Sequence, residues 1–122
     1  MKVLNLTQHT ATDEQVAQGV IDLVGDELST MKSLLTFVGL PSAETIHDRA
    51  YEVAKLAQAH DVESVMIGGA PFFMGALERA LQKRGIKPLY AFSERVSVEK
   101  VIDGAVVKTN EFKHIGFVEV WL

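Results

Sequence analysis

The chain has 122 residues, with 12 lysines and arginines against 16 aspartates and glutamates, a formal net charge of −4 and no cysteine. This length fits one domain with a single hydrophobic core, so residues 1–122 are treated as one domain. The acidic balance argues against binding long nucleic acid through a basic surface, although backbone amides and a few cationic side chains can still hold a small anion. Lack of cysteine excludes disulfides and cysteine nucleophiles.

The N-terminal residues lack the apolar stretch and cleavage site of a signal peptide. No run approaches the roughly 20 apolar residues of a membrane span. We therefore expect a soluble, cytoplasmic protein without contact to a membrane.

The first elements expected along the chain are a buried strand and a capped helix. Residues 2–7 form a short apolar run that predicts a strand, and Thr12 to Gln15 match a capping box. Apolar residues at helical spacing then predict a helix from about Asp13 to Val24. The polar residues 25–32 are expected to form a loop with one helical turn, and the apolar run 34–38 a second strand.

The middle of the chain predicts a helix, a strand and another helix. Ser42 after Pro41 is expected to cap a helix that ends near His60. Residues 64–67 form a short apolar strand that stops at two glycines. Pro71 suits the first position of the next helix, and Gly85 ends it.

The C-terminal third predicts strands only. Leu89 to Phe92 is expected to be a strand, followed by a hairpin of residues 95–102 and 105–109 and a final strand at 115–121. Asp103-Gly104 favours a two-residue hairpin turn, because glycine accepts the positive φ that such turns require. The whole pattern predicts an α/β fold: a mainly parallel sheet flanked by helices, with a C-terminal antiparallel hairpin and final strand. Right-handed crossovers would gather the loops after the first, third and fourth strands on one edge.

Two of these loops offer groups for a ligand. Thr7, Gln8, His9 and Thr10 present hydroxyls, an amide and an imidazole after the first strand, although an ordinary polar turn explains them as well. Gly68, Gly69, Ala70 and Pro71 let backbone approach a ligand closely, and amides at a helix start suit a phosphate. The third glycine of a dinucleotide fingerprint and the lysine of a phosphate loop are missing, and tight packing explains the glycines equally well. Phe72 is the aromatic residue best placed to stack on an adenine.

A third candidate group follows the fourth strand. Ser93 offers a neutral donor, Glu94 a carboxylate and Arg95 a planar fork that matches phosphate. An ion pair between Arg95 and Glu99, which share one face of a strand, is the structural alternative.

Lys113 and His114 precede the expected final strand. The lysine can neutralise phosphate, and the imidazole titrates near neutral pH and can carry protons, although a surface role for the histidine is as common. The four histidines show no spacing typical of metal ligands, so neither a metal nor a cofactor is expected.

Two blocks of this sequence resemble a known family. They are Tyr90–Glu99 with Asp103-Gly104, Lys108 and Phe112–His114, and Val3–His9 with Thr12 and Glu14-Gln15. Together they resemble the small, single-domain CRISPR-associated ring nucleases, which have a CARF-like, Rossmann-type domain. The turn at Gly68 to Pro71 departs from that family's pattern, which has an acidic residue there.

The resemblance implies a homodimeric enzyme that binds cyclic oligoadenylate, above all cyclic tetra-adenylate, and cuts it into linear adenylates without a metal. This metal-independent phosphodiesterase would switch off type III CRISPR signalling. Arg95 and Lys113 would neutralise phosphate, Thr7 and Ser93 would position the ring, and His9 or His114 would carry protons. The alternatives are a non-catalytic cyclic nucleotide sensor or sponge, and a small binding protein for another phosphate ligand.

Overall fold

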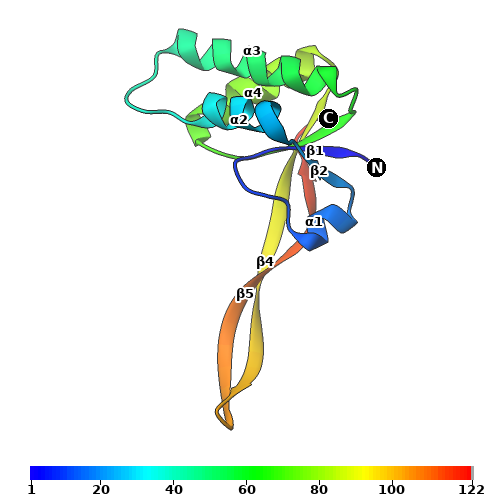
Figure 1. Cartoon of the computed structure of the whole chain (residues 1–122), viewed down its shortest axis with the longest axis vertical. Helices are drawn as coiled ribbons and strands as arrows, with labels where there is room; N and C mark the ends of the chain where they lie inside the picture. Colours follow the sequence, from blue (N-terminus) through cyan, green and yellow to red (C-terminus); the bar gives the residue numbers. More distant parts are fainter. Residues whose placement is uncertain (122) are drawn as a thin grey trace.

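A computed structural model of the chain describes residues 1–121. It is an α/β structure with one mixed five-stranded sheet in the order β2-β1-β3-β4-β5 (Figure 1). The elements in chain order are β1 (Val3–Leu6), α1 (Asp13–Ala17), β2 (Val20–Asp22), α2 (Gly25–Leu35), α3 (Ala43–Ala59), β3 (Ser64–Ile67), α4 (Pro71–Lys83), β4 (Lys87–Ile102) and β5 (Ala105–Glu119).

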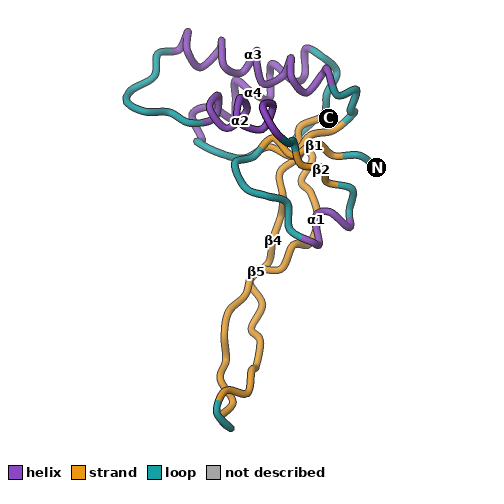
Figure 2. The backbone as a smooth tube through the Cα atoms, viewed as in Figure 1, coloured by secondary structure: helices purple, strands orange, loops and turns teal. Residues whose placement is uncertain are grey.

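Helices α2, α3 and α4 cover one face of the sheet, and α1 lies on the other side (Figures 1 and 2). Side chains alternate along the strands accordingly. Leu4, Leu6, Val65 and Ile67 pack in the larger core with α2, α3 and α4. Val3, Val20, Met66 and Leu89 form a smaller cluster, against which Ala11 and Phe117 pack. The parallel strands are therefore buried on both faces, as their continuous apolar sequences indicate.

The two long helices and the strand between them begin where the sequence predicts. The Ser42 hydroxyl accepts from the amide of Thr45 at the start of α3, which ends at Ala59. Pro71 occupies the first turn of α4, and Gly85 follows the helix with a φ of +71°, a conformation that favours glycine. These predictions rested on local capping chemistry, and the structure confirms them.

The predicted helix from Asp13 to Val24 is too long. The capping box of Thr12 and Gln15 is present, but α1 ends at Ala17 and residues 20–22 form β2. Gly19 makes the break with a φ of +100°, and a Cβ there would lie 1.9 Å from the Met1 carbonyl oxygen. The Gly19 carbonyl in turn accepts from the Val3 amide at 2.9 Å, which starts the pairing of β2 with β1.

The predicted loop at 25–32 and strand at 34–38 are also wrong. One helix, α2, spans Gly25–Leu35 and buries Met31 and Leu35. Leu28, Met31 and Leu35 recur at helical spacing and pack in the larger core. Residues 36–42, between α2 and α3, lie outside the sheet, and Val38 is almost fully exposed. A strand has no partner there.

The largest difference from the prediction is the length of β4 and β5. They pair antiparallel from Leu89↔Glu119 to Ile102↔Ala105, so the sheet is mixed rather than mainly parallel. The Asp103-Gly104 turn is confirmed, with φ values of +50° and +77°. Residues 93–114, which we call the ribbon, extend far beyond the rest of the sheet (Figure 1). A register shift at Phe92/Ser93 marks its start.

Within residues 1–121, no helix is both long and apolar enough to cross a membrane.

Candidate functional site

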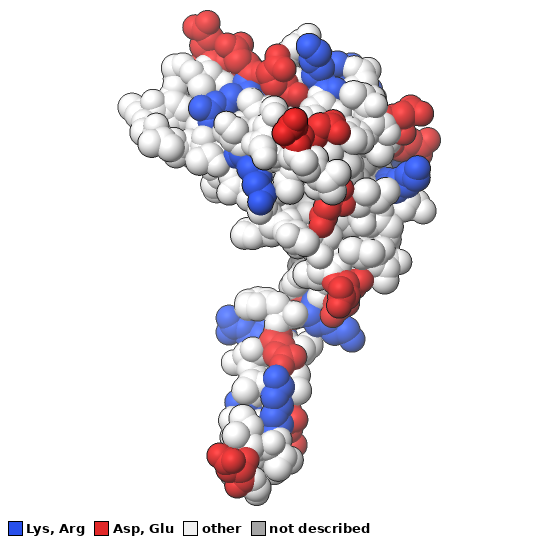
Figure 3. Space-filling model, viewed as in Figure 1, with Lys and Arg blue, Asp and Glu red and all other residues white. Residues whose placement is uncertain are grey.

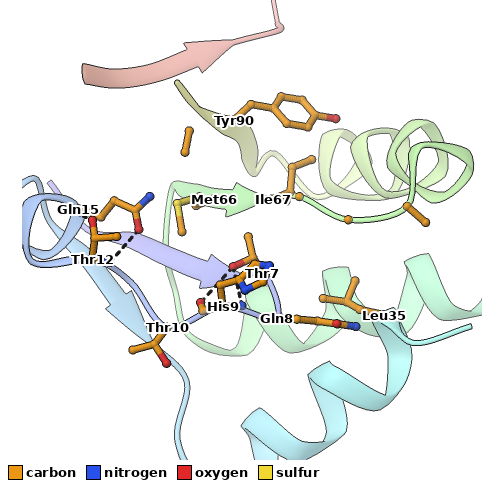
Figure 4. Close-up of a pocket in the computed structure, with 14 residues that line it drawn as sticks. Thr7, Gln8, His9, Thr10, Thr12, Gln15, Leu35, Met66, Ile67 and Tyr90 are labelled. Carbon is orange, nitrogen blue, oxygen red and sulfur yellow. Dashed lines mark hydrogen bonds between the residues drawn. The ribbon is translucent and has the colours of Figure 1, made fainter. Parts of the chain in front are cut away.

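A pocket of about 450 Å³ opens at the carboxyl ends of β1 and β3 (Figure 4). The chain leaves β1 toward α1 on one side of the sheet and leaves β3 toward α4 on the other. The crevice between two such strands is the point where open α/β sheets bind ligands. The lining residues are Thr7, Gln8, His9, Thr10, Thr12, Gln15, Leu35, Met66, Ile67, Gly68, Gly69, Ala70, Tyr90 and Ala91.

Asn5 holds the first loop of this pocket in place. Its side chain lies in β1 and is 3% exposed. The Asn5 Oδ1 accepts from the Thr7 amide at 2.9 Å and from the Thr7 hydroxyl at 2.7 Å. The Asn5 Nδ2 donates to the His9 carbonyl and to Asp22 Oδ1, both at 2.7 Å. Every hydrogen-bonding group of this buried amide is therefore used, which fixes the loop of Thr7 to His9.

Asp22 extends this network to the next stretch of the loop. Both of its carboxylate oxygens accept from the Ala11 amide, at 3.2 and 3.3 Å. Asp22 lies opposite Asn5 in the register of β1 and β2. The short strand β2 thus serves the site: it carries the carboxylate that orders the segment between β1 and α1.

The second loop of the pocket places backbone amides next to the cavity. Gly69 has a φ of +150°, a conformation that side chains rarely adopt, and a Cβ on Gly68 would lie 3.5 Å from Thr7 Cγ2. The backbone of Gly69 therefore favours glycine at this turn, whereas Gly68 has room for a side chain. Because α4 begins at Pro71, its dipole favours an anion at this end.

Tyr90 of β4 forms the wall beside α4. Its hydroxyl donates to Glu78 Oε2 at 2.5 Å, and its ring extends from β4 toward α4 (Figure 4). Burial raises the pKa of the Tyr90 phenol, and the hydrogen bond and charge of Glu78 raise that pKa further. Tyr90 is therefore a fixed, neutral aromatic side chain at the cavity.

The pocket has both apolar and polar lining residues and is almost without charge. Its described lining contains hydroxyls, amides and the imidazole of His9, but no lysine, arginine or carboxylate. A small cavity of about 40 Å³ on the other side of the loop at Thr7–Thr10 is lined by Lys32 and Asp22. No group of three or more potential metal ligands occurs among residues 1–121.

Half of the residues singled out from the sequence line this pocket: Thr7, Gln8, His9, Thr10, Gly68, Gly69 and Ala70. Pro71 starts α4, and Phe72 is half-exposed with its ring 5.0 Å from that of Phe37. The structure thus brings together the loops after β1 and β3, two blocks far apart in the sequence.

The candidate residues that the sequence placed on β4 and β5, which are Ser93, Glu94, Arg95, Lys113 and His114, do not line the pocket. The chain does not turn at Ser93, Glu94 and Arg95, because β4 continues as a strand into the ribbon. In the ribbon Glu94 lies opposite Lys113, and Arg95 lies opposite Phe112, whose ring centre is 5.5 Å from the guanidinium carbon. Arg95 and Lys113 are exposed.

His114 lies at a contact between elements. It is buried, its Nε2 lies 2.9 Å from Gln18 Oε1, and its amide donates to Glu14 Oε2 at 3.1 Å. Its Nδ1 is buried without a hydrogen-bond partner. These contacts hold α1 against β5.

Sequence reasoning missed Asn5, Asp22 and Tyr90 as site residues. A polar Asn5 between Leu4 and Leu6 in an otherwise apolar strand was the available signal, because a buried amide needs partners nearby. Asp22 was hidden by the prediction of a longer helix. Tyr90 lay in an apolar run, where nothing local indicates which face it occupies.

The fold and the pocket define an α/β protein with a mixed sheet and a nearly uncharged cavity at its strand ends. A family model described as "Uncharacterized protein MJ1673 family" matches residues 1–118. The chain therefore belongs to the MJ1673 family. Comparisons with curated proteins and with solved structures found no match.

Proposed function

We propose that the protein is a ring nuclease, which binds cyclic oligoadenylate at this pocket and cleaves it, with cyclic tetra-adenylate as the preferred ring. The observation that carries the proposal is the convergence of Thr7–Thr10 with Gly68–Ala70 at the carboxyl edge of β1 and β3. This edge offers hydroxyls, an imidazole and the backbone of Gly68 to Ala70 around one cavity. In this proposal the domain is a CARF-like variant of the Rossmann-type fold and acts in the cytoplasm.

The proposed chemistry needs only groups that position the reacting ribose and phosphate and that stabilise charge on the phosphate oxygens. A ribose 2′-oxygen attacks the adjacent phosphorus, the bond from phosphorus to the 5′-oxygen breaks, and the proton of the 2′-hydroxyl ends on the 5′-oxygen. The product carries a 2′,3′-cyclic phosphate and a 5′-hydroxyl, and no water is consumed. Two such cuts convert cyclic tetra-adenylate into two linear di-adenylates.

Each pocket group has a role in this reaction. The imidazole of His9 carries the proton, because it is the histidine among the lining residues. The amides of Gly69 and Ala70 hold the phosphate in line for attack. Thr7 positions the ring indirectly, because its hydroxyl donates to Asn5 Oδ1 and so orders the loop that presents His9. The Tyr90 ring provides a surface against which an adenine can stack. Arg95 and Lys113 contribute only if a second chain brings them to the cavity, which agrees with the proposed homodimer.

The test is incubation of the purified protein with radiolabelled cyclic tetra-adenylate, with and without EDTA, followed by separation of products and a native gel. We expect linear di-adenylate in both samples, a shifted ring on the gel, and loss of product in His9→Ala. Gln82→Ala, on the exposed surface of α4, is the matched control. An uncut ring that does not shift on the gel would contradict the proposal.

One observation favours a second candidate, a binding protein without catalysis. The described lining of the pocket has no cationic side chain, so one subunit alone lacks the charge that stabilises a phosphorane-like transition state. Such a sensor or sponge would shift the ring on the native gel and release no product. Binding of a different phosphate ligand, with no shift by any cyclic oligonucleotide, is the remaining alternative.

A further inference from the structure

The turn of the ribbon carries branched apolar side chains into solvent. Val101 is 74% exposed and Val106 is 66% exposed, and Ile102 and Val107 beside them are also exposed. They surround the Asp103-Gly104 turn at the far end of the molecule from the helices (Figure 1). An isolated two-stranded ribbon is marginally stable in water, so a surface of this kind indicates a missing partner.

A second exposed apolar surface lies beside the pocket. In the loop between α2 and α3, Val38 is 94% exposed and Leu40 is 100% exposed. Phe72, half-exposed at the start of α4, packs against Phe37 of the same loop. The loop adjoins the ligand pocket, because Leu35 lines the cavity and the Gln8 side chain donates to the Thr36 hydroxyl at 3.0 Å.

One chain cannot cover its own loop with its own ribbon. At about 3.3 Å per residue, the strand from Ser93 to Ile102 carries the turn roughly 30 Å away from the pocket edge. Figure 1 shows the ribbon and the loop between α2 and α3 pointing in different directions from the sheet. In a dimer, the ribbon turn of one copy can cover the exposed loop of the other. A two-fold axis repeats this contact in the opposite direction.

The charges of the ribbon favour a second copy as the partner. Its acidic residues are Glu94, Glu99, Asp103 and Glu111, and its basic residues are Arg95, Lys100, Lys108 and Lys113. The ribbon is therefore neutral, and the net charge of −4 belongs to the remainder of the chain. Both signs alternate along it, and Lys100 pairs with Glu111 at 2.7 Å (Figure 3). The neutral ribbon can therefore pack on the acidic remainder of a second copy without the electrostatic repulsion that two acidic surfaces would have.

We propose that two copies exchange their ribbons, so that the turn around Val101 and Val106 of each packs on Val38, Leu40 and Phe72 of the other. The ribbon at residues 93–114 approaches the roughly 20–30 residues that each side of a stable interface contributes. Arg95 and Lys108 share the face of the ribbon that carries Val101 and Val106. The exchange therefore brings cationic side chains toward the partner's pocket, whose lining has none. This inference rests on the homodimer of the proposed function, but it does not depend on which ligand the pocket binds.

The test combines cross-linking with sedimentation. Because the natural chain lacks cysteine, Leu40→Cys and Val106→Cys chains each carry one reactive thiol. A short bismaleimide should join the two variants when they are mixed, and each variant alone should give little product. In sedimentation, Leu40→Asp and Val106→Asp should each weaken the dimer by roughly 100-fold, because each change acts at both contacts of a two-fold dimer.

The matched control is Val24→Asp, which introduces the same charge at an exposed valine that caps α2 and should leave the dimer intact. Circular dichroism of each variant establishes that it is folded. A monomeric natural chain, or a dimer whose mixed cysteine variants do not cross-link, would overturn the exchange. A dimer that cross-links as expected but leaves cyclic tetra-adenylate uncut would support the interface and remove only the proposed enzyme.

Discussion

Replacement of Asn5 by alanine tests the organisation of the site most sharply. The change removes four hydrogen bonds, to Thr7 twice, to His9 and to Asp22. At a net value of roughly 0.5–1.5 kcal/mol each, their sum lies between about 2 and 6 kcal/mol. Some of the loop groups that lose Asn5 can form hydrogen bonds with water instead. We therefore expect the free energy of unfolding to fall by about 3 kcal/mol, near the lower end of this range. A domain of roughly 5–15 kcal/mol stability survives this loss.

Urea unfolding followed by circular dichroism measures this change, with Gln82→Ala on the exposed surface of α4 as the control. Asn5→Ala should lower the free energy of unfolding by about 3 kcal/mol with an unchanged slope, while the control stays within about 0.5 kcal/mol of the natural chain. Asn5→Ala should also lose ligand binding while still folded, because the loop after β1 loses its support. A loss below about 1 kcal/mol, with binding intact, would refute the role assigned to Asn5.

Three further predictions concern the pocket and the break before β2. Gly69→Ala should lower the free energy of unfolding by roughly 1–3 kcal/mol and remove most ligand binding, because alanine is strained at a φ of +150°. Calorimetry that finds equal binding by the variant and the natural chain would contradict this prediction. Gly19→Ala should give little folded protein in circular dichroism, because its Cβ meets the Met1 carbonyl oxygen at 1.9 Å. Tyr90→Phe should be less stable than the natural chain at neutral pH. Burial and Glu78 raise the pKa of Tyr90 in the folded chain, so the unfolded chain ionises first as pH rises. The difference in unfolding free energy between the natural chain and Tyr90→Phe should therefore be full below pH 10 and shrink above it. A difference that stays constant with pH would contradict this.

Elements with local chemical signals could be predicted from the sequence. Ser42 and Pro71 start helices through capping and a fixed φ, and Asp103-Gly104 makes a turn through its positive φ values. The two loops at the carboxyl ends of β1 and β3 followed from the strand order and the handedness of crossovers. These predictions depended on neighbouring residues or on general topology.

Features set by distant partners could not be predicted in this way. Val20 and Leu23 fit a helix or a strand, and the pairing of β2 with β1 decides between them. Ser93 to Arg95 are polar and exposed, which suggested a strand end, yet the strand continues because β5 supplies its hydrogen bonds. One partner of Asn5 is Asp22, which the predicted longer helix had hidden.

The products of cyclic tetra-adenylate test the central claim most directly. The purified protein is incubated with the ring in excess EDTA, and the products are identified by mass spectrometry. The proposal predicts linear di-adenylate with a 2′,3′-cyclic phosphate and a 5′-hydroxyl, formed by the natural chain and by Gln82→Ala but not by His9→Ala. An unchanged ring after prolonged incubation, or products that appear equally with His9→Ala, would contradict the assignment of this pocket as a ring nuclease site.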